Sequence, residues 1–164
     1  MPAGLADQLK TRKEFLDLAK FVSLLGRPGP YANDERPVIR KWRIAPGSAS
    51  KPPAADTPWK TTYSMVDGML SDEDLALGEI VYAQGSVDVQ VAGPVKLLLN
   101  SHEGLKLWID DRPVSDLAAP IDLPTGRHTF TFAIQRDQRD AQGLRAELTP
   151  PTGSTAKFTP EGGL

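Results

Sequence analysis

The sequence predicts an all-β protein, an antiparallel β-sandwich of the jelly-roll type, with one α-helix at its N-terminal end. Two observations lead to the sandwich. From Glu79 onward, short segments of alternating apolar and polar residues follow one another at about ten-residue spacing. Glycine (14) and proline (15) are also frequent among the 164 residues, as in chains with many turns. The third observation is that helical periodicity stands out in one segment near the N-terminus.

That segment is expected to form a helix that begins after Thr11. Thr11 and Glu14 have the spacing of a capping box, and Gly26 is suited to end the helix. The apolar stripe recurs at helical spacing and needs an apolar partner, so we expect it to pack on the sandwich. It consists of Phe15, Leu18, Val22 and Leu25. We therefore divide the chain into a helical segment, residues 1–30, and a β-sandwich domain, residues 31–164.

The remaining elements are expected to be strands. The sequence indicates them at VIRKWRIA (38–45), WKTTYSMV (59–66), EIVYAQ (79–84), SVDVQVAG (86–93), PVKLLLNS (94–101), GLKLWIDD (104–111), APIDL (119–123), RHTFTFAIQ (127–135), GLRAELT (143–149) and TAKFTP (155–160). Alternation puts Leu105, Leu107 and Ile109 on one face, so Trp108 points to the other. We expect the helix or a loop to cover that second face. The charged residues of the first strand are interpreted as a half-exposed face.

Composition excludes several classes of function. The net charge of −2 without a long basic run argues against a nucleic-acid partner. The chain has no cysteine, so it cannot form a thiolate zinc site or attach a c-type haem through thioethers. No stretch approaches 18 consecutive apolar residues, so we expect no membrane span, and no signal peptide is visible. We expect no cofactor.

Candidate binding residues lie around one predicted hairpin. His102 and Glu103 occupy the turn before Gly104, and Asp110 and Asp111 occupy the next turn. Aspartate adopts turn conformations readily, so the pair has either a structural role or forms a polar, cation-binding rim. Trp108 is a candidate for stacking on a sugar ring.

The segments GPVKLLLNSHEGLKLWIDDRPV and IDLPTGRHTFTFAIQ resemble the PA14-type β-sandwich over roughly residues 85–148. The resemblance implies a domain that binds carbohydrate or acts as a spacer, and in some members adjacent aspartates hold Ca²⁺ against the sugar. Here His102 and Glu103 stand at the family's acidic pair, and Asp111 stands at its turn glycine. We therefore expect no tight calcium site.

The segment MPAGLADQLKTRKEFLDLAKFVSLLG is similar to the end of a cytochrome c domain. In that family a methionine is an axial haem ligand, and the matching position is Met1. The helix, the following GRPGPY and a tryptophan-containing strand also resemble the C-terminal region of large planctomycete-type dehydrogenase or cytochrome proteins. This resemblance implies an upstream haem or dehydrogenase domain, and a periplasmic or extracellular location.

Together these features predict a non-catalytic accessory module of a larger exported protein, with a glycan as its ligand. The first alternative is a structural C-terminal domain that positions a redox domain. The second is a glycan-acting enzyme in which Glu103 and Asp110 flank the glycoside. Ser101 and His102 do not suggest a nucleophile and base, because neighbouring side chains on a strand point to opposite faces.

Overall fold

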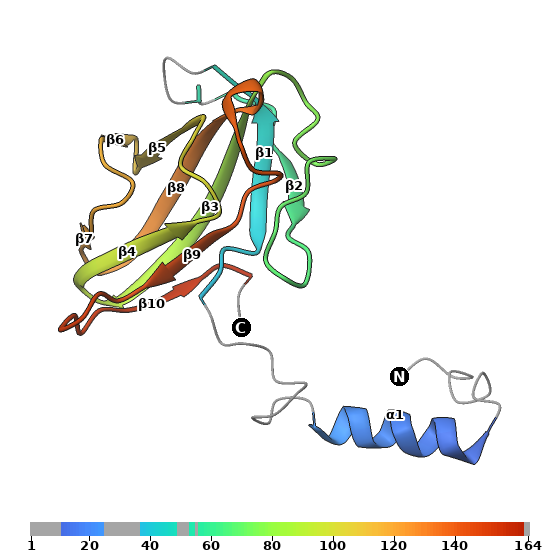
Figure 1. Ribbon diagram of the computed structural model, residues 1–164. Coiled ribbons are helices and arrows are strands. Elements are labelled where there is room, and N and C mark those ends of the chain that lie inside the picture. Colours follow the sequence, from blue (N-terminus) through green and yellow to red (C-terminus); the bar gives the residue numbers. More distant parts are fainter. Residues whose placement is uncertain (1–10, 25–36, 49–52, 55, 163–164) are drawn as a thin grey trace. The chain divides into compact units, whose positions relative to one another are not determined.

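A computed structural model describes residues 11–24, 37–48, 53–54 and 56–162 of the chain (Figure 1). The chain divides into two compact units, Met1–Glu35 and Arg36–Leu164, and each is described by itself. In the described part of the chain, no helix has the length and apolar character needed to cross a membrane. Met1 and Gly26 lie outside the described residues.

The helix α1 spans Arg12–Leu24 and begins with the expected capping box. The Thr11 N–H donates to Glu14 Oε2 at 3.3 Å, and the Glu14 N–H donates to Thr11 Oγ1 at 3.2 Å. Phe15 and Val22 of the apolar stripe are each 54% exposed. That the stripe packs on the sandwich stays a prediction.

The second unit is built from two antiparallel sheets, which confirms the all-β sandwich (Figure 1). The larger sheet has the order β2 (Lys60–Tyr63), β1 (Lys41–Pro46), β3 (Ile80–Val91), β8 (Gly126–Gln135), β5 (Leu105–Ile109) and β6 (Arg112–Val114), with β10 (Lys157–Pro160) also paired to β3. The smaller sheet has the order β7 (Ile121–Leu123), β4 (Gly93–Leu99) and β9 (Ala146–Thr149).

One apolar core fills the space between the sheets, and its members are those that the alternation predicts. From the smaller sheet come Val95, Leu97, Ala146 and Leu148; from the larger sheet come Leu107, Ile109, Phe130, Phe132 and Ile134. Trp42 of β1 is fully buried and meets Phe132 edge-to-face, with 5.9 Å between ring centroids. The strand faces that carry the core were therefore predictable from period-2 patterning alone.

The structure differs from the expected strands at Gly85. The segments EIVYAQ and SVDVQVAG form the single strand β3, which continues through this glycine. A Cβ at Gly85 would lie 2.4 Å from Ile39 Cγ2 and 3.5 Å from the Trp42 ring. Gly85 therefore marks a close approach of core side chains to the strand rather than a turn. The segment RPV forms β6, which the sequence did not predict as a strand.

Candidate functional site

The Asp110–Asp111 turn closes the hairpin of β5 and β6. Ile109 and Arg112 are paired across it, so the two aspartates are the whole loop. Their φ angles are +48° and +64°. Positive φ at both central residues is the pattern of a type I′ turn, and aspartate is among the few non-glycine residues that tolerate it. The turn-forming interpretation of this pair therefore has direct geometric support.

The carboxylate of Asp110 ties this turn to the start of β8. Its Oδ2 lies 2.6 Å from Nδ1 of His128, and its Oδ1 accepts a hydrogen bond of 2.8 Å from the Thr129 N–H. On the other side of the ring, His128 Nε2 lies 2.8 Å from the Pro124 carbonyl oxygen. A carboxylate and a carbonyl both accept, so the imidazolium, with two N–H groups, satisfies both contacts.

Opposing effects act on the pKa of His128. Burial lowers the pKa, since the residue is only 6% exposed. The hydrogen bonds to Asp110 and Pro124 and the attraction of the Asp110 charge raise it, and they prevail, so the pKa lies above its ordinary value. Asp110 thus serves the fold as the counter-ion of a buried histidine.

This arrangement separates the acidic residues that the PA14 resemblance singles out. Both oxygens of Asp110 are engaged, while Glu103 lies beyond the opposite end of β5. Asp111 is exposed. Among the described residues, no group of three or more His, Asp or Glu side chains is placed to hold a metal ion. That the turn holds no tight calcium site stays a prediction that solution measurements can test.

His102 and Glu103 lie in an exposed loop that leads from β4 of the smaller sheet to β5 of the larger sheet, so the hairpin predicted around this turn is wrong. The loop is held by its neighbours. Ser101 Oγ accepts from the Glu103 N–H at 3.1 Å and donates to the Asp140 carboxylate. The Glu103 carbonyl accepts from Arg139 at 3.3 Å. The backbone of this turn is thereby tied to the loop that follows β8.

Trp108 does not offer a sugar-stacking face, which corrects its assignment as a ligand-binding candidate. It is 7% exposed and packs in a second apolar cluster with Tyr82 and Ala133, against the partly buried Trp59 and Ile80. The second face of the sheet is therefore covered at Trp108, as expected, and Trp59 from the segment before β2 contributes to the cover. The Tyr82 hydroxyl donates to the Ser48 carbonyl at 3.0 Å.

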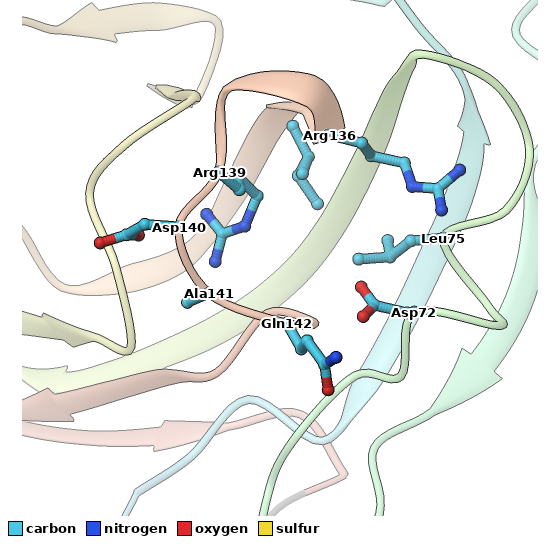
Figure 2. Close-up of a pocket in the computed structure, with 8 residues that line it drawn as sticks. Asp72, Leu75, Arg136, Arg139, Asp140, Ala141 and Gln142 are labelled. Atoms are coloured by element: carbon cyan, nitrogen blue, oxygen red, sulfur yellow. The ribbon is translucent and has the colours of Figure 1, made fainter.

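A hollow of about 270 Å³ lies between the turn before β3 and the loop after β8 (Figure 2). Its two arginines, Arg136 and Arg139, are balanced by Asp72 and Asp140. Asp72 and Arg139 connect the turn before β3 and the loop after β8 through hydrogen bonds to the backbone of Gly143. Asp72 accepts from the Gly143 N–H at 2.8 Å, and Arg139 donates to the Gly143 carbonyl at 2.8 Å. We therefore interpret the polar groups of this hollow as structural contacts between the two loops.

A second hollow, of about 200 Å³, lies on the outer face of the larger sheet. It opens where β3 changes partner along one edge: β1 pairs with residues 81–84 and β10 with residues 87–91. We call it the branch groove. Its lining consists of Lys41, Arg43, Thr61, Gln84, Gly85, Ser86, Arg127 and Glu161. The divergence of β1 and β10 from a shared neighbour is what leaves this space open.

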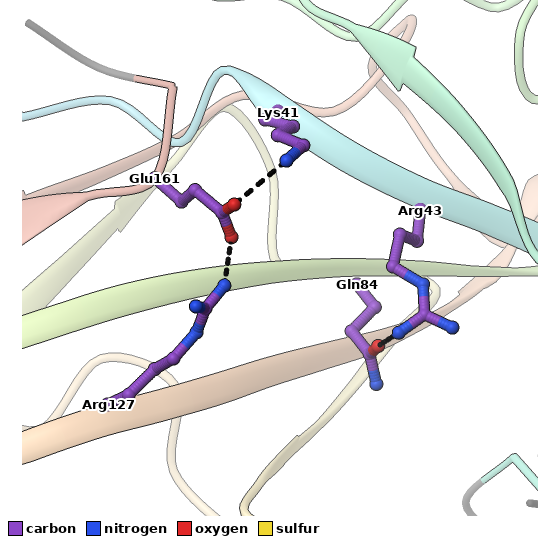
Figure 3. A network of polar contacts seen from close by, with 5 residues as sticks. All are labelled: Lys41, Arg43, Gln84, Arg127 and Glu161. Atoms are coloured by element: carbon purple, nitrogen blue, oxygen red, sulfur yellow. Dashed lines mark hydrogen bonds and ion pairs between the residues drawn. The ribbon is translucent and has the colours of Figure 1, made fainter.

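Glu161, just after β10, organises the branch groove (Figure 3). Its backbone N–H donates to the Ser86 carbonyl at 2.8 Å, so the chain end is fixed at the branch point. Its carboxylate pairs with Lys41 Nζ at 2.8 Å and with Arg127. The hydrogen bond from Lys41 and the positive charge of Arg127 lower the pKa of Glu161, and the same hydrogen bond raises the pKa of Lys41.

Arg43 lies on the same face and contacts uncharged groups. Its Nη1 donates to Gln84 Oε1 at 3.4 Å, and its guanidinium lies 5.1 Å from the centroid of the Trp59 ring. Gln84 in turn donates to Thr131 Oγ1 at 3.0 Å. The register pairs Arg43 with Gln84 and Gln84 with Thr131, so the three side chains form one row across the sheet.

Sequence reasoning missed the branch groove. Its basic residues on β1 were interpreted as a half-exposed strand face, Arg127 received no role within IDLPTGRHTFTFAIQ, and Glu161 lies outside the quoted motifs. The alternation of β1 was a usable signal for Lys41 and Arg43, but Glu161 is 120 residues from Lys41. No protein-family model matches the chain, and none of the curated proteins matches it.

Proposed function

We propose that the sandwich is a non-catalytic accessory module that binds a glycan in the branch groove, as part of a larger exported protein. The observation that carries the proposal is the groove itself. Hydrogen-bonding side chains from β1, β2, β3, β8 and the C-terminal segment converge there on a hollow of about 200 Å³. Concave sites with a few converging polar groups are the usual form of small-ligand sites.

The chemistry of the lining suits a sugar. Arg43 and Gln84 present planar arrays of polar atoms, which can bond two neighbouring hydroxyl groups at once. Trp59 lies beside Arg43 and is partly buried, so an aromatic ring borders the polar groups. The PA14 resemblance, whose members include carbohydrate binders, agrees with this assignment but points to a different surface.

A binding role is favoured over catalysis by the placement of the candidate carboxylates. Glu103 and Asp110 lie at opposite ends of β5, and Asp110 is the partner of His128. A glycosidase needs two carboxyl groups on either side of one bond, about 5–10 Å apart. Glu161 in the branch groove already bridges two cations.

The test is a survey of immobilised neutral and acidic oligosaccharides with the full chain, followed by calorimetric titration of the best ligand. Arg43→Ala and Gln84→Ala are expected to weaken binding by about tenfold each, the effect of losing one or two good hydrogen bonds. Lys96→Ala, on the smaller sheet, is the control and is expected to bind as the parent does. Absence of glycan binding, or equal binding by all variants, would refute the proposal.

The apolar stripe of α1 favours a second candidate, the structural domain of a redox fusion. Phe15, Leu18 and Val22 recur at helical spacing along α1, and such a stripe needs an apolar partner, which in this candidate is a redox domain. Deletion of residues 1–26 distinguishes the two roles. An unchanged melting temperature, together with a Cys-x-x-Cys-His motif encoded upstream, would favour the structural role. A clear fall would show that the helix stabilises this sandwich instead.

A further inference from the structure

We infer that the branch groove selects acidic sugars, those that carry a carboxylate or a sulfate ester. The inference rests on the proposed function and names the ligand class of the same site. Its basis is the charge and hydrogen-bonding state of the lining. Three cationic side chains, Lys41, Arg43 and Arg127, meet one carboxylate, Glu161. The groove is therefore positive by two charges, although the whole chain has a net charge of −2.

Hydrogen-bond donors are also in excess within the lining. Each arginine has five N–H groups and the lysine has three, none of which can accept. Both oxygens of Glu161 are taken, one by Lys41 and one by Arg127. Gln84 accepts one hydrogen bond from Arg43 and donates one to Thr131, so it keeps one N–H and one oxygen lone pair for a ligand. A ligand that supplies acceptors and negative charge matches this surplus better than one that supplies neutral hydroxyl groups.

Arg43 is the cation least committed to a negative partner. Within the described part of the chain, its side chain contacts Gln84 and the Trp59 ring, neither of which is charged. Arg127, by contrast, pairs with Glu161 and stands opposite Asp88 in the register of β3 and β8. Arg43 is thus the first expected contact of an incoming anion, and Trp59 reports its movement.

Glu161 shows that the groove accommodates a carboxylate between two of its cations. This internal carboxylate neutralises part of the charge that an acidic ligand would otherwise meet. Removing the Glu161 carboxylate should therefore change the affinity in opposite directions for an acidic and for a neutral ligand. Glu161→Gln raises the net charge of the lining to three and frees Lys41 and Arg127, so acidic ligands should bind more tightly. If the groove instead recognised neutral sugars through an acceptor at Glu161, the same substitution would weaken binding.

The experiment titrates the full chain with three probes: trigalacturonate, a sulfated galactan oligosaccharide and the neutral galactotriose. Calorimetry and tryptophan fluorescence provide the readouts. We expect at least one acidic probe to bind about tenfold or more tightly than the neutral one, and to weaken as NaCl is raised from 20 to 200 mM. The stronger of the two acidic probes identifies the anion as carboxylate or sulfate.

Arg43→Gln and Lys96→Gln form a matched pair, since both remove one positive charge. Arg43→Gln should weaken acidic binding about tenfold or more, Lys96→Gln should leave it unchanged, and Glu161→Gln should strengthen it. Circular dichroism and melting temperatures confirm that each variant is folded, and the Arg43 result stands without the Glu161 variant. If Arg43→Gln and Lys96→Gln weaken the binding of the acidic probes equally, the attraction is diffuse electrostatics, and the inference is overturned.

Acidic selectivity and glycan binding in the branch groove are refuted by different results. Equal binding of neutral and acidic probes, with loss on Arg43→Gln, overturns acidic selectivity and leaves glycan binding in the groove intact. Weaker acidic binding by Glu161→Gln also overturns the selectivity. No binding of any probe at millimolar concentration removes the inference, and a negative result in the wider oligosaccharide survey then removes the proposed function.

Discussion

The contact between Asp110 and His128 makes a prediction that separates charge from turn geometry. Asp110→Asn keeps a residue that tolerates positive φ, and its amide oxygen can still accept from the Thr129 N–H. What it removes is the negative charge beside a buried imidazolium. Asp111→Asn is the matched control, because it makes the same change at the neighbouring position of the same turn, where the side chain is exposed.

The size of the effect follows from the contacts. A hydrogen bond to a charged group contributes about 1.5–3 kcal/mol. The Asp110 side chain is 46% exposed, so solvent screening reduces its value, and we expect Asp110→Asn to cost about 1–2 kcal/mol. Asp110→Ala additionally loses the bond to Thr129 and places alanine at positive φ, for a total of about 3 kcal/mol. Asp111→Asn should change the free energy of unfolding by less than about 0.5 kcal/mol.

The contribution of His128 also has a defined pH dependence. Its pKa is raised in the folded state, because the bonds to Asp110 and Pro124 outweigh burial. The stabilisation is therefore fully present below the unfolded pKa, about 6.5, and is lost as the pH rises through the folded pKa. Urea unfolding at pH 6 and pH 9 should show a difference between the parent and Asp110→Asn that is larger at pH 6.

Two results would refute this reasoning. If Asp110→Asn and Asp111→Asn unfold at the same urea concentration, the Asp110 charge contributes nothing particular to the fold. If the gap between the parent and Asp110→Asn is as large at pH 9 as at pH 6, the stabilisation does not come from the charged imidazole. His128→Asn, which removes the titrating ring, should lose the pH-dependent difference as well.

Other predictions concern the core and the calcium question. Gly85→Ala should lower the free energy of unfolding by about 1–3 kcal/mol in urea titrations, because the new Cβ would lie 2.4 Å from Ile39 Cγ2. Millimolar Ca²⁺ should leave the melting temperature unchanged, whereas a site filled at about 100-fold its Kd would add about 2.7 kcal/mol. A rise that Asp111→Ala abolishes would restore a cation-binding role to the turn.

The sequence was most informative where structure depends on local repetition. Alternation along Leu105, Leu107 and Ile109 predicted which face meets the core, because side chains on a strand alternate regardless of its partners. The capping box of Thr11 and Glu14 is equally local. At Gly85 the local signal was misleading, since the need for a glycine came from Ile39 and Trp42, side chains of a distant segment.

The candidate site was less predictable because its parts meet only through long-range pairing. The Asp110–Asp111 turn was visible from the sequence, but its histidine partner lies 18 residues away from Asp110 on β8. The branch groove depends on β10 returning to the same edge of β3 that β1 occupies. Nothing in the local pattern of TAKFTP specifies that register, and so nothing local brings Glu161 to Lys41.

Asp110 and Glu161 illustrate why residue type alone was a poor guide to the proposed binding surface. Asp110 lies in the segment that resembles the PA14-type sandwich, yet it supports a buried histidine, and its exposed neighbour Asp111 completes the turn. Glu161 belongs to no motif, yet it lies in a hollow among three cations. What distinguishes them is the balance of donors and acceptors around each. Around Asp110 both carboxylate oxygens are matched within the fold, whereas around Glu161 donors outnumber acceptors, and the proposed binding of an acidic ligand rests on that excess.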